Sequence, residues 1–179
     1  IGADPDGDEL CGFNHVLGDP AAGQFAVVAL LAALRHRNKT GQGQYVDLSM
    51  VESVGTMMGE ATMAFEMNGA SAEPRGNRHP FLAPHGLYPC DGDDEWVAIA
   101  VETLEEWHAL CDVIGCTDFK DDLALNTYDG RTKKRVEVDS KIGDWTKGRS
   151  QYEVTEALQE RGVAATPCLD QQGRFLDPH

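Results

Sequence analysis

The sequence predicts an α/β protein in two parts: a helix–strand–helix segment typical of the end of a layered α/β domain, then a small α+β domain with a short antiparallel sheet. Three features of the 179 residues support this prediction. An apolar run over residues 21–37 has the length and composition of a buried helix. Residues 45–50 alternate as a short strand does, and apolar runs on both sides of an acidic turn at 91–94 indicate a β-hairpin.

The first part is expected to form two helices joined by a strand, after an opening loop rich in Gly, Asp and Pro. Asp19 suits the N-cap of the first helix, and Pro20 suits its first turn, where a missing N–H costs nothing. Tyr45–Met50 is the expected strand, and its sheet partners must come from an upstream segment or another subunit. Ser49 or a neighbour then caps a second helix, which Gly69 ends.

Composition also suggests where the parts divide. Residues 1–68 are expected to end a large domain, residues 69–86 to form a linker punctuated by Gly and Pro, and residues 87–179 to form the small domain. In the small domain we expect the hairpin over 87–101, helices over 103–114, 131–145 and 150–161, and a returning strand over 163–169. We expect the chain to be a piece of a longer protein.

The formal net charge of −15 disfavours two classes of partner, nucleic acids and anionic membrane surfaces, because both require a basic face. The longest apolar stretch, residues 26–34, has about half of the roughly 20 residues that a membrane span needs. No signal peptide is visible at the start of the sequence, and the five cysteines show no CxxC pair. We therefore expect a cytoplasmic protein with free thiols and no metal site, in which the acidic turn at 91–94 is solvated.

The residues alone give only modest catalytic signals. The sequence contains no GxSxG, HxxxH or phosphate-loop pattern, and its six histidines are scattered. Asp19 has a purely structural interpretation, because an N-cap aspartate contributes about 1 kcal/mol to a helix and need do nothing else. Catalysis at Asp19 is therefore left open by spacing and composition.

Seven motifs, in this order along the chain, resemble the middle of class III CoA-transferases of the CaiB/BaiF type. This family includes formyl-CoA transferase, carnitine CoA-transferase and α-methylacyl-CoA racemase. The motifs are Leu17–Gly23, Ala33–Arg37, Thr40–Met50, Arg75–Arg78, Pro84–Tyr88, Trp96–Val101 and Gly162–Pro167. Each motif is short, but their common order extends across nearly the whole chain.

The resemblance implies that Asp19 is the nucleophile of a CoA-transferase and carries an aspartyl-CoA thioester during the reaction. It also implies that residues 1–68 belong to a Rossmann-like large domain, and that the full protein is a homodimer acting on an acyl-CoA and a carboxylic acid acceptor. Coenzyme A is then a substrate and no cofactor is bound. Most of its contacts are expected upstream of this chain, which alone should not turn over substrate. Within the motifs, Arg75, Arg78 and Gly86 are the candidates for contact with coenzyme A.

Two alternatives remain open beside the transferase. A racemase would use Asp19 as an acid/base together with a histidine, although His15 does not match the position of the family's histidine. A non-catalytic module would use Asp19 only as a helix cap.

Overall fold

The computed structural model describes residues 2–3, 10–11, 17–71 and 75–177. The chain divides into two compact units: the first unit, Ile1–Gly76, and the second unit, Asn77–His179. The expected division into residues 1–68, 69–86 and 87–179 remains a prediction, as does the assignment of residues 1–68 to a Rossmann-like domain. His15 lies outside the described residues.

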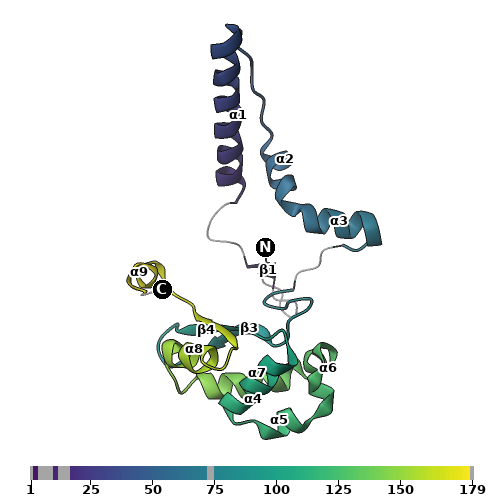
Figure 1. The fold of residues 1–179 in the computed structure, drawn as a ribbon, viewed down its shortest axis with the longest axis vertical. Coiled ribbons are helices and arrows are strands. Elements are labelled where there is room, and N and C mark those ends of the chain that lie inside the picture. Colours follow the sequence, from purple (N-terminus) through teal and green to yellow (C-terminus); the bar gives the residue numbers. More distant parts are fainter. Residues whose placement is uncertain (1, 4–9, 12–16, 72–74, 178–179) are drawn as a thin grey trace. The chain divides into compact units, whose positions relative to one another are not determined.

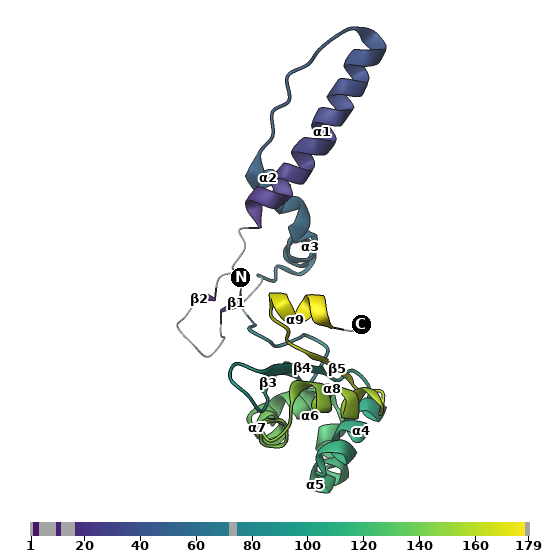
Figure 2. The same cartoon turned by 90° about the vertical axis from the view of Figure 1, so that its left-hand side faces the viewer.

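The first unit is built around one long helix. Strands β1 (Gly2–Ala3) and β2 (Leu10–Cys11) pair antiparallel in a stretch where a loop was expected. Helix α1 (Gly18–Thr40) follows, and it ends at Gly41, whose φ of 75° is a left-handed C-cap. Residues 41–49 then run back beside α1, and α2 (Met50–Gly55) packs against that helix (Figures 1 and 2).

The expected strand at 45–50 is absent from the described structure. Residues 42–49 have no regular secondary structure, and the Tyr45 side chain is 89% exposed. A strand is stabilised by hydrogen bonds to a neighbouring strand, and no described strand of the first unit pairs with this segment. The alternating pattern was therefore insufficient to define a strand without a partner.

The expected second helix is interrupted. Ser49 caps it as predicted, with its Oγ accepting a 3.2 Å hydrogen bond from the Glu52 N–H. The helix then breaks into α2, the 3₁₀ turn η1 (Thr56–Met58) and α3 (Gly59–Asn68) before Gly69 ends it. Glycines at the junctions weaken the α-helix, and the Thr56 hydroxyl bonds back to the Ser53 carbonyl at 2.7 Å, which favours a bend.

Helix α1 is less buried than its apolar sequence predicted. Within the described first unit, its buried residues are Ala21 and Ala22, near the end where α2 packs. Apolar side chains farther along are exposed, including Phe25 at 42% and Leu31 at 62%. The composition therefore predicted a helix correctly, whereas its expected burial does not hold for the described residues of this unit.

The second unit contains a three-stranded antiparallel sheet in the order β3–β4–β5. Its strands are β3 (His85–Pro89), β4 (Trp96–Ala100) and β5 (Ala164–Pro167). The hairpin register places His85 opposite Ala100 and Pro89 opposite Trp96, and it confirms the predicted hairpin and returning strand. Figures 1 and 2 show α4, α7 and α8 on one face of this sheet.

The helices of the second unit are partly as predicted. Thr103 and Ser150 each form a capping box at the start of a helix, as the sequence indicated for Ser150. The predicted helix over 131–145 is two helices, because Lys134 leaves the helical region with φ −99° and ψ 21°. The elements are α4 (Leu104–Ile114), α5 (Thr117–Asp121), η2 (Leu123–Asn126), α6 (Tyr128–Lys133), α7 (Arg135–Thr146), α8 (Gln151–Gln159) and α9 (Gln171–Leu176).

One hydrophobic core holds the sheet against these helices. Its fully buried side chains include Val97, Val101, Trp107, Leu110, Leu125, Ile142, Val154 and Leu158. Arg131 is buried at the edge of this core, with its guanidinium carbon 5.4 Å from the Trp107 ring centroid. Its Nε and Nη1 donate to the backbone carbonyls of Ala83 and Leu125, so these carbonyls satisfy two of its nitrogens.

Candidate functional site

Asp19 lies in the first turn of α1 and does not occupy the predicted N-cap position. The helix begins at Gly18, the N-cap is Leu17, and no side chain caps this end. The sequence could not fix the start, because the first four N–H groups of any helix lack intrahelical partners and Pro20 is tolerated throughout that turn. The Asp19 side chain is exposed and makes no hydrogen bond or ion pair with another described residue.

The start of α1 is held by close packing against α2. A Cβ built on Gly18 would lie 3.2 Å from Sδ of Met50 and 3.9 Å from Cγ2 of Val54, so glycine permits the close approach at this point. Ala21 and Ala22 are buried in the same turn and the next. Asp19 is consequently an accessible carboxylate on a fixed helix end, where the helix dipole favours negative charge.

The other three predicted site residues, Arg75, Arg78 and Gly86, are divided between the two units. Arg75 is exposed in the first unit, whereas Arg78 and Gly86 belong to the second unit. Arg78 lines a smaller hollow of about 50 Å³ and Gly86 lines a larger hollow of about 250 Å³. Arg135 and Asp139 line both hollows, so the structure brings Arg78 and Gly86 to neighbouring positions in the second unit.

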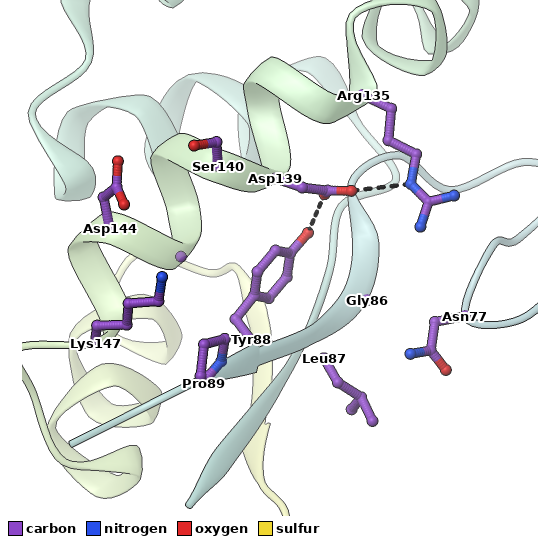
Figure 3. Close-up of a pocket in the computed structure, with 11 residues that line it drawn as sticks. Asn77, Gly86, Leu87, Tyr88, Pro89, Arg135, Asp139, Ser140, Asp144 and Lys147 are labelled. Carbon is purple, nitrogen blue, oxygen red and sulfur yellow. Dashed lines mark hydrogen bonds and ion pairs between the residues drawn. The ribbon is translucent and has the colours of Figure 1, made fainter. Parts of the chain in front are cut away.

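The larger hollow contains a polar cluster that the sequence analysis missed (Figure 3). The Tyr88 hydroxyl donates to Oδ1 of Asp139 at 2.7 Å, and Nε of Arg135 donates to Oδ2 of the same carboxylate at 2.9 Å. Burial, reinforced by Asp139, raises the pKa of Tyr88 well above its ordinary value, so Tyr88 remains a donor. The four-residue spacing of Arg135 and Asp139 on a helix was the available signal for the ion pair.

The buried thiols of the second unit are poor nucleophiles. Burial, with a smaller effect from Cys168, raises the pKa of Cys90 to about 11. Burial, with a smaller effect from Cys116, raises the pKa of Cys111 to about 12. Because the thiolate is the reactive form, neither cysteine is a good nucleophile near neutral pH.

Two further properties apply to the described residues alone. Among them, no group of three or more His, Cys, Asp or Glu side chains is placed to hold a metal ion. In the same part of the chain, no helix has the length and hydropathy needed to cross a membrane.

Known proteins resemble this chain along most of its length. A probable CoA-transferase of Mycobacterium tuberculosis is 32% identical over 160 residues, which are 89% of this chain and 20% of that protein. Succinyl-CoA–D-citramalate CoA-transferase of Chloroflexus aurantiacus is 29% identical over 163 residues, which are 91% of this chain and 40% of that enzyme. The chain thus spans less than half the length of these curated relatives.

The fold is shared with a solved structure. A CaiB/BaiF family protein from Brucella suis superimposes with a TM-score of 0.89 at 24% identity, over 99% of this chain and 46% of that one. The sequence model of the family described as CoA-transferase family III matches residues 3–179. This match covers nearly every residue, and it shows that the chain belongs to CoA-transferase family III.

Proposed function

We propose that this chain is part of an enzyme that transfers coenzyme A from an acyl-CoA to a carboxylic acid, with Asp19 as the nucleophile. Membership of the family supports the reaction class. The observation that carries the role of Asp19 is its position: an exposed carboxylate without a side-chain partner in the described structure, in the first turn of a 23-residue helix.

The reaction begins when an Asp19 oxygen attacks the thioester carbonyl of the donor. The C–S bond breaks, the CoA thiolate leaves, and an acyl-aspartyl anhydride forms. The thiolate then attacks the aspartyl carbonyl of this anhydride, which releases the donor acid as its carboxylate and leaves an aspartyl-CoA thioester. No oxidant or net proton transfer is required in these two steps.

The second half of the reaction runs these two steps in reverse, with the acceptor acid in place of the donor acid. The acceptor carboxylate attacks the aspartyl thioester, expels the thiolate and forms a new anhydride. The thiolate attacks the acceptor's carbonyl in that anhydride, giving the new acyl-CoA and restoring the Asp19 carboxylate. Asp19 belongs to the first turn of α1, where the unpaired N–H groups of the helix start can stabilise negative charge that develops on the reacting carboxyl.

The substrates we favour are small dicarboxylic acids and their CoA thioesters. The name of the Chloroflexus relative contains two acids, succinate and citramalate, and each has two carboxyl groups. The homodimer implied by the resemblance and the cytoplasmic location expected from the cysteines and the start of the sequence remain predictions, as do contacts of Arg75, Arg78 and Gly86 with coenzyme A.

The test is to trap the covalent intermediate in the full-length protein. The protein is incubated with succinyl-CoA, treated with hydroxylamine, and its peptides are analysed by mass spectrometry. We expect a hydroxamate on Asp19 that is absent from Asp19→Asn. Glu60→Gln is the matched control, because Glu60 is also an exposed acid in the first turn of a helix, and this variant should retain the adduct on Asp19.

Two other results would contradict the proposal. Exchange of deuterium at the substrate α-carbon without an adduct would favour the racemase. The absence of both signals would favour a non-catalytic module, although Asp19 could not then act as the N-cap, since Leu17 occupies that position.

A further inference from the structure

The end of helix α4 brings two cysteines close together. Gly115, with a φ of 72°, ends this helix in the left-handed region. The N–H of Cys116 donates to the carbonyl of Cys111 at 2.9 Å, and the N–H of Gly115 donates to the carbonyl of Asp112 at 3.4 Å. These two bonds form a Schellman motif, in which the chain turns back on the last turn of the helix. Cys116 is thereby held against the turn that contains Cys111.

The hydrogen bond between the two residues also fixes how far apart they are. Hydrogen-bonded residues of antiparallel strands have Cα atoms about 5.5 Å apart, and the direct bond from Cys116 to Cys111 implies a similar separation. Disulfides most often join residues whose Cα atoms are about 5.5–6 Å apart. The backbone at this turn therefore already has the separation that a disulfide needs.

The two side chains lie on the same side of the turn. Residues at these two positions of a Schellman motif commonly make an apolar contact. Cys111 belongs to the hydrophobic core of the second unit, and Cys116 is one of the partly buried residues that pack against this core. Both cysteines are free thiols in the structure. The turn therefore presents two neighbouring thiols that are not joined.

We propose that Cys111 and Cys116 form a reversible disulfide when the protein meets a low-molecular-weight disulfide such as oxidised glutathione. The bridge would connect the end of α4 to the start of α5 and close a loop of a few residues. It would oppose fraying of this junction, because a closed loop has fewer unfolded conformations. The rigidity of the junction then depends on the thiol–disulfide balance around the protein.

The other two free thiols of the second unit do not form such a pair. The N–H of Cys90 bonds to the carbonyl of Glu95, and the N–H of Cys168 bonds to the carbonyl of Trp96. The chain that leads into β4 therefore lies between Cys90 and Cys168. Two strand spacings are about 9.5 Å, and residues more than about 7 Å apart cannot be bridged without movement of the backbone.

The two thiols have unequal roles in the reaction. Cys116 is partly exposed, whereas Cys111 is 1% exposed, so Cys116 meets the oxidant first. The Cys116 thiolate attacks one sulfur of oxidised glutathione, the S–S bond breaks, and one glutathione thiolate leaves. The Cys111 sulfur then attacks Sγ of Cys116, and its proton passes to the second glutathione as that thiolate departs. Two protein thiols are oxidised, and one glutathione disulfide is reduced to two thiols.

The second attack is the slow step. Burial, with a smaller effect from Cys116, raises the pKa of Cys111 to about 12, so little of its thiolate is present near neutral pH. The Schellman motif offsets this, because it holds Cys111 at a high effective concentration beside Cys116. The bridge is therefore expected at equilibrium with an oxidising glutathione mixture and not after a brief exposure.

The test equilibrates the full-length protein with mixtures of oxidised and reduced glutathione. The remaining thiols are then alkylated in denaturant, and the protein is digested without reductant. An endoproteinase that cleaves before aspartate separates the two cysteines, because Asp112 lies between them. We expect peptide 94–111 to be linked to peptide 112–117, and reduction to release the two.

Repeating the equilibration in urea measures what the fold contributes. We expect the equilibrium constant for the bridge to be about tenfold or more lower in urea, because the unfolded chain does not hold the two thiols together. Equal constants in the folded and unfolded protein would show that closeness in sequence, and not the Schellman motif, determines the pairing. That result would overturn the inference.

Two variants control the assignment. Cys116→Ser should abolish the linked peptides, and Cys168→Ser should form them as the wild type does. Cys168 is the matched control because it is another partly buried free thiol of the second unit. Native tryptophan fluorescence checks that each variant is folded, since all three tryptophans of this chain lie in the second unit.

Three other results would overturn the inference. Both cysteines could be alkylated at every glutathione ratio, or Cys111 could be alkylated while a glutathione mixed disulfide persists on Cys116. The linked peptides could also join Cys111 or Cys116 to a different cysteine. None of these results depends on an adduct at Asp19, so the inference and the proposed function are tested separately.

Discussion

The hydroxyl of Tyr88 donates a 2.7 Å hydrogen bond to Oδ1 of Asp139, which joins strand β3 to helix α7 across 51 residues of sequence. Tyr88 is 4% exposed, and burial keeps it protonated by raising its pKa. The bond therefore connects the sheet to α7, the helix that carries Arg135. The shapes of the larger and smaller hollows depend on this connection.

Removing this hydroxyl should destabilise the second unit. We expect Tyr88→Phe to lower its free energy of unfolding by about 1.5–3 kcal/mol, the usual value for a hydrogen bond to a charged group. Urea unfolding followed by tryptophan fluorescence measures this. Tyr152→Phe is the control, since Tyr152 is 49% exposed and should change stability little. Equal effects of the two variants would contradict a special role for the Tyr88 bond.

Gly130 is a position that tolerates no side chain. A Cβ built there would lie 1.6 Å from the carbonyl oxygen of Ala124, which is backbone and cannot turn aside. We expect Gly130→Ala to destabilise the second unit by about 3 kcal/mol, at the upper end of overpacking effects. The same unfolding experiment on Gly148→Ala, where a Cβ meets nothing within 4 Å, supplies the comparison. If Gly130→Ala and Gly148→Ala have similar free energies of unfolding, the η2–α6 junction is less tightly packed than the structure indicates.

Asp122 should give the second unit a measurable dependence on pH. A hydrogen bond from Lys134 Nζ at 2.6 Å, together with one from the Ala124 N–H, lowers the pKa of Asp122. A carboxyl with a lowered pKa in the folded state adds stability above its ordinary pKa and loses it as the pH falls. The stability difference between wild type and Asp122→Asn should therefore shrink below about pH 4.

Unfolding free energies of both proteins across the acid range check this expectation. Asp121→Asn is the matched control, because the Asp121 side chain is exposed and has no hydrogen bond or ion pair to another described residue. Its stability difference from the wild type should stay nearly constant with pH. A constant difference for Asp122→Asn as well would show that the Lys134 contact does not persist in solution.

The proposed catalytic role of Asp19 depends on Gly18. A valine at position 18 would press on Met50 and displace the first turn of α1, and misplacement of a catalytic group by about 1 Å can cost up to 100-fold in rate. We expect Gly18→Val to lower the transfer rate of the full-length protein at least tenfold, about 1.4 kcal/mol in the barrier. Gly23→Ala, on the same helix in open space, should leave the rate unchanged. If Gly18→Val transfers coenzyme A at the wild-type rate, packing at Gly18 does not fix the position of Asp19.

Local signals in the sequence predicted most of the second unit. Ser150 with Glu153 three residues later gave the capping box of α8, and Gly115 and Gly162 gave positive-φ residues where helices end. These features depend on residues close together in the chain. The break at Lys134 was not predictable in this way, because nothing in the adjacent residues excludes a continuous helix.

Features that depend on distant residues escaped prediction. The strand expected at Tyr45–Met50 needs a partner to exist, and alternation alone cannot supply one. Asp19 could be named from the family resemblance, whereas its place inside the first turn required the backbone. The contact of Tyr88 with Asp139 arises only when β3 and α7 pack together, so the polar cluster had no sequence signature beyond a four-residue spacing.

The register of the β3–β4 hairpin also separates positive from negative charge along the second unit. At one end lies His85, whose ring is 5.2 Å from that of His79, beside the smaller hollow that Arg78, Arg131 and Arg135 line; at the other end, Pro89 leads into the acidic turn Asp91–Glu95. A five-residue strand spans about 17 Å, roughly twice the screening length of about 8 Å at physiological salt. The electrostatic potentials at the two ends of the hairpin therefore do not cancel. An approaching anion is repelled from the turn and drawn to the opposite end, so the hairpin orients the encounter before any contact forms.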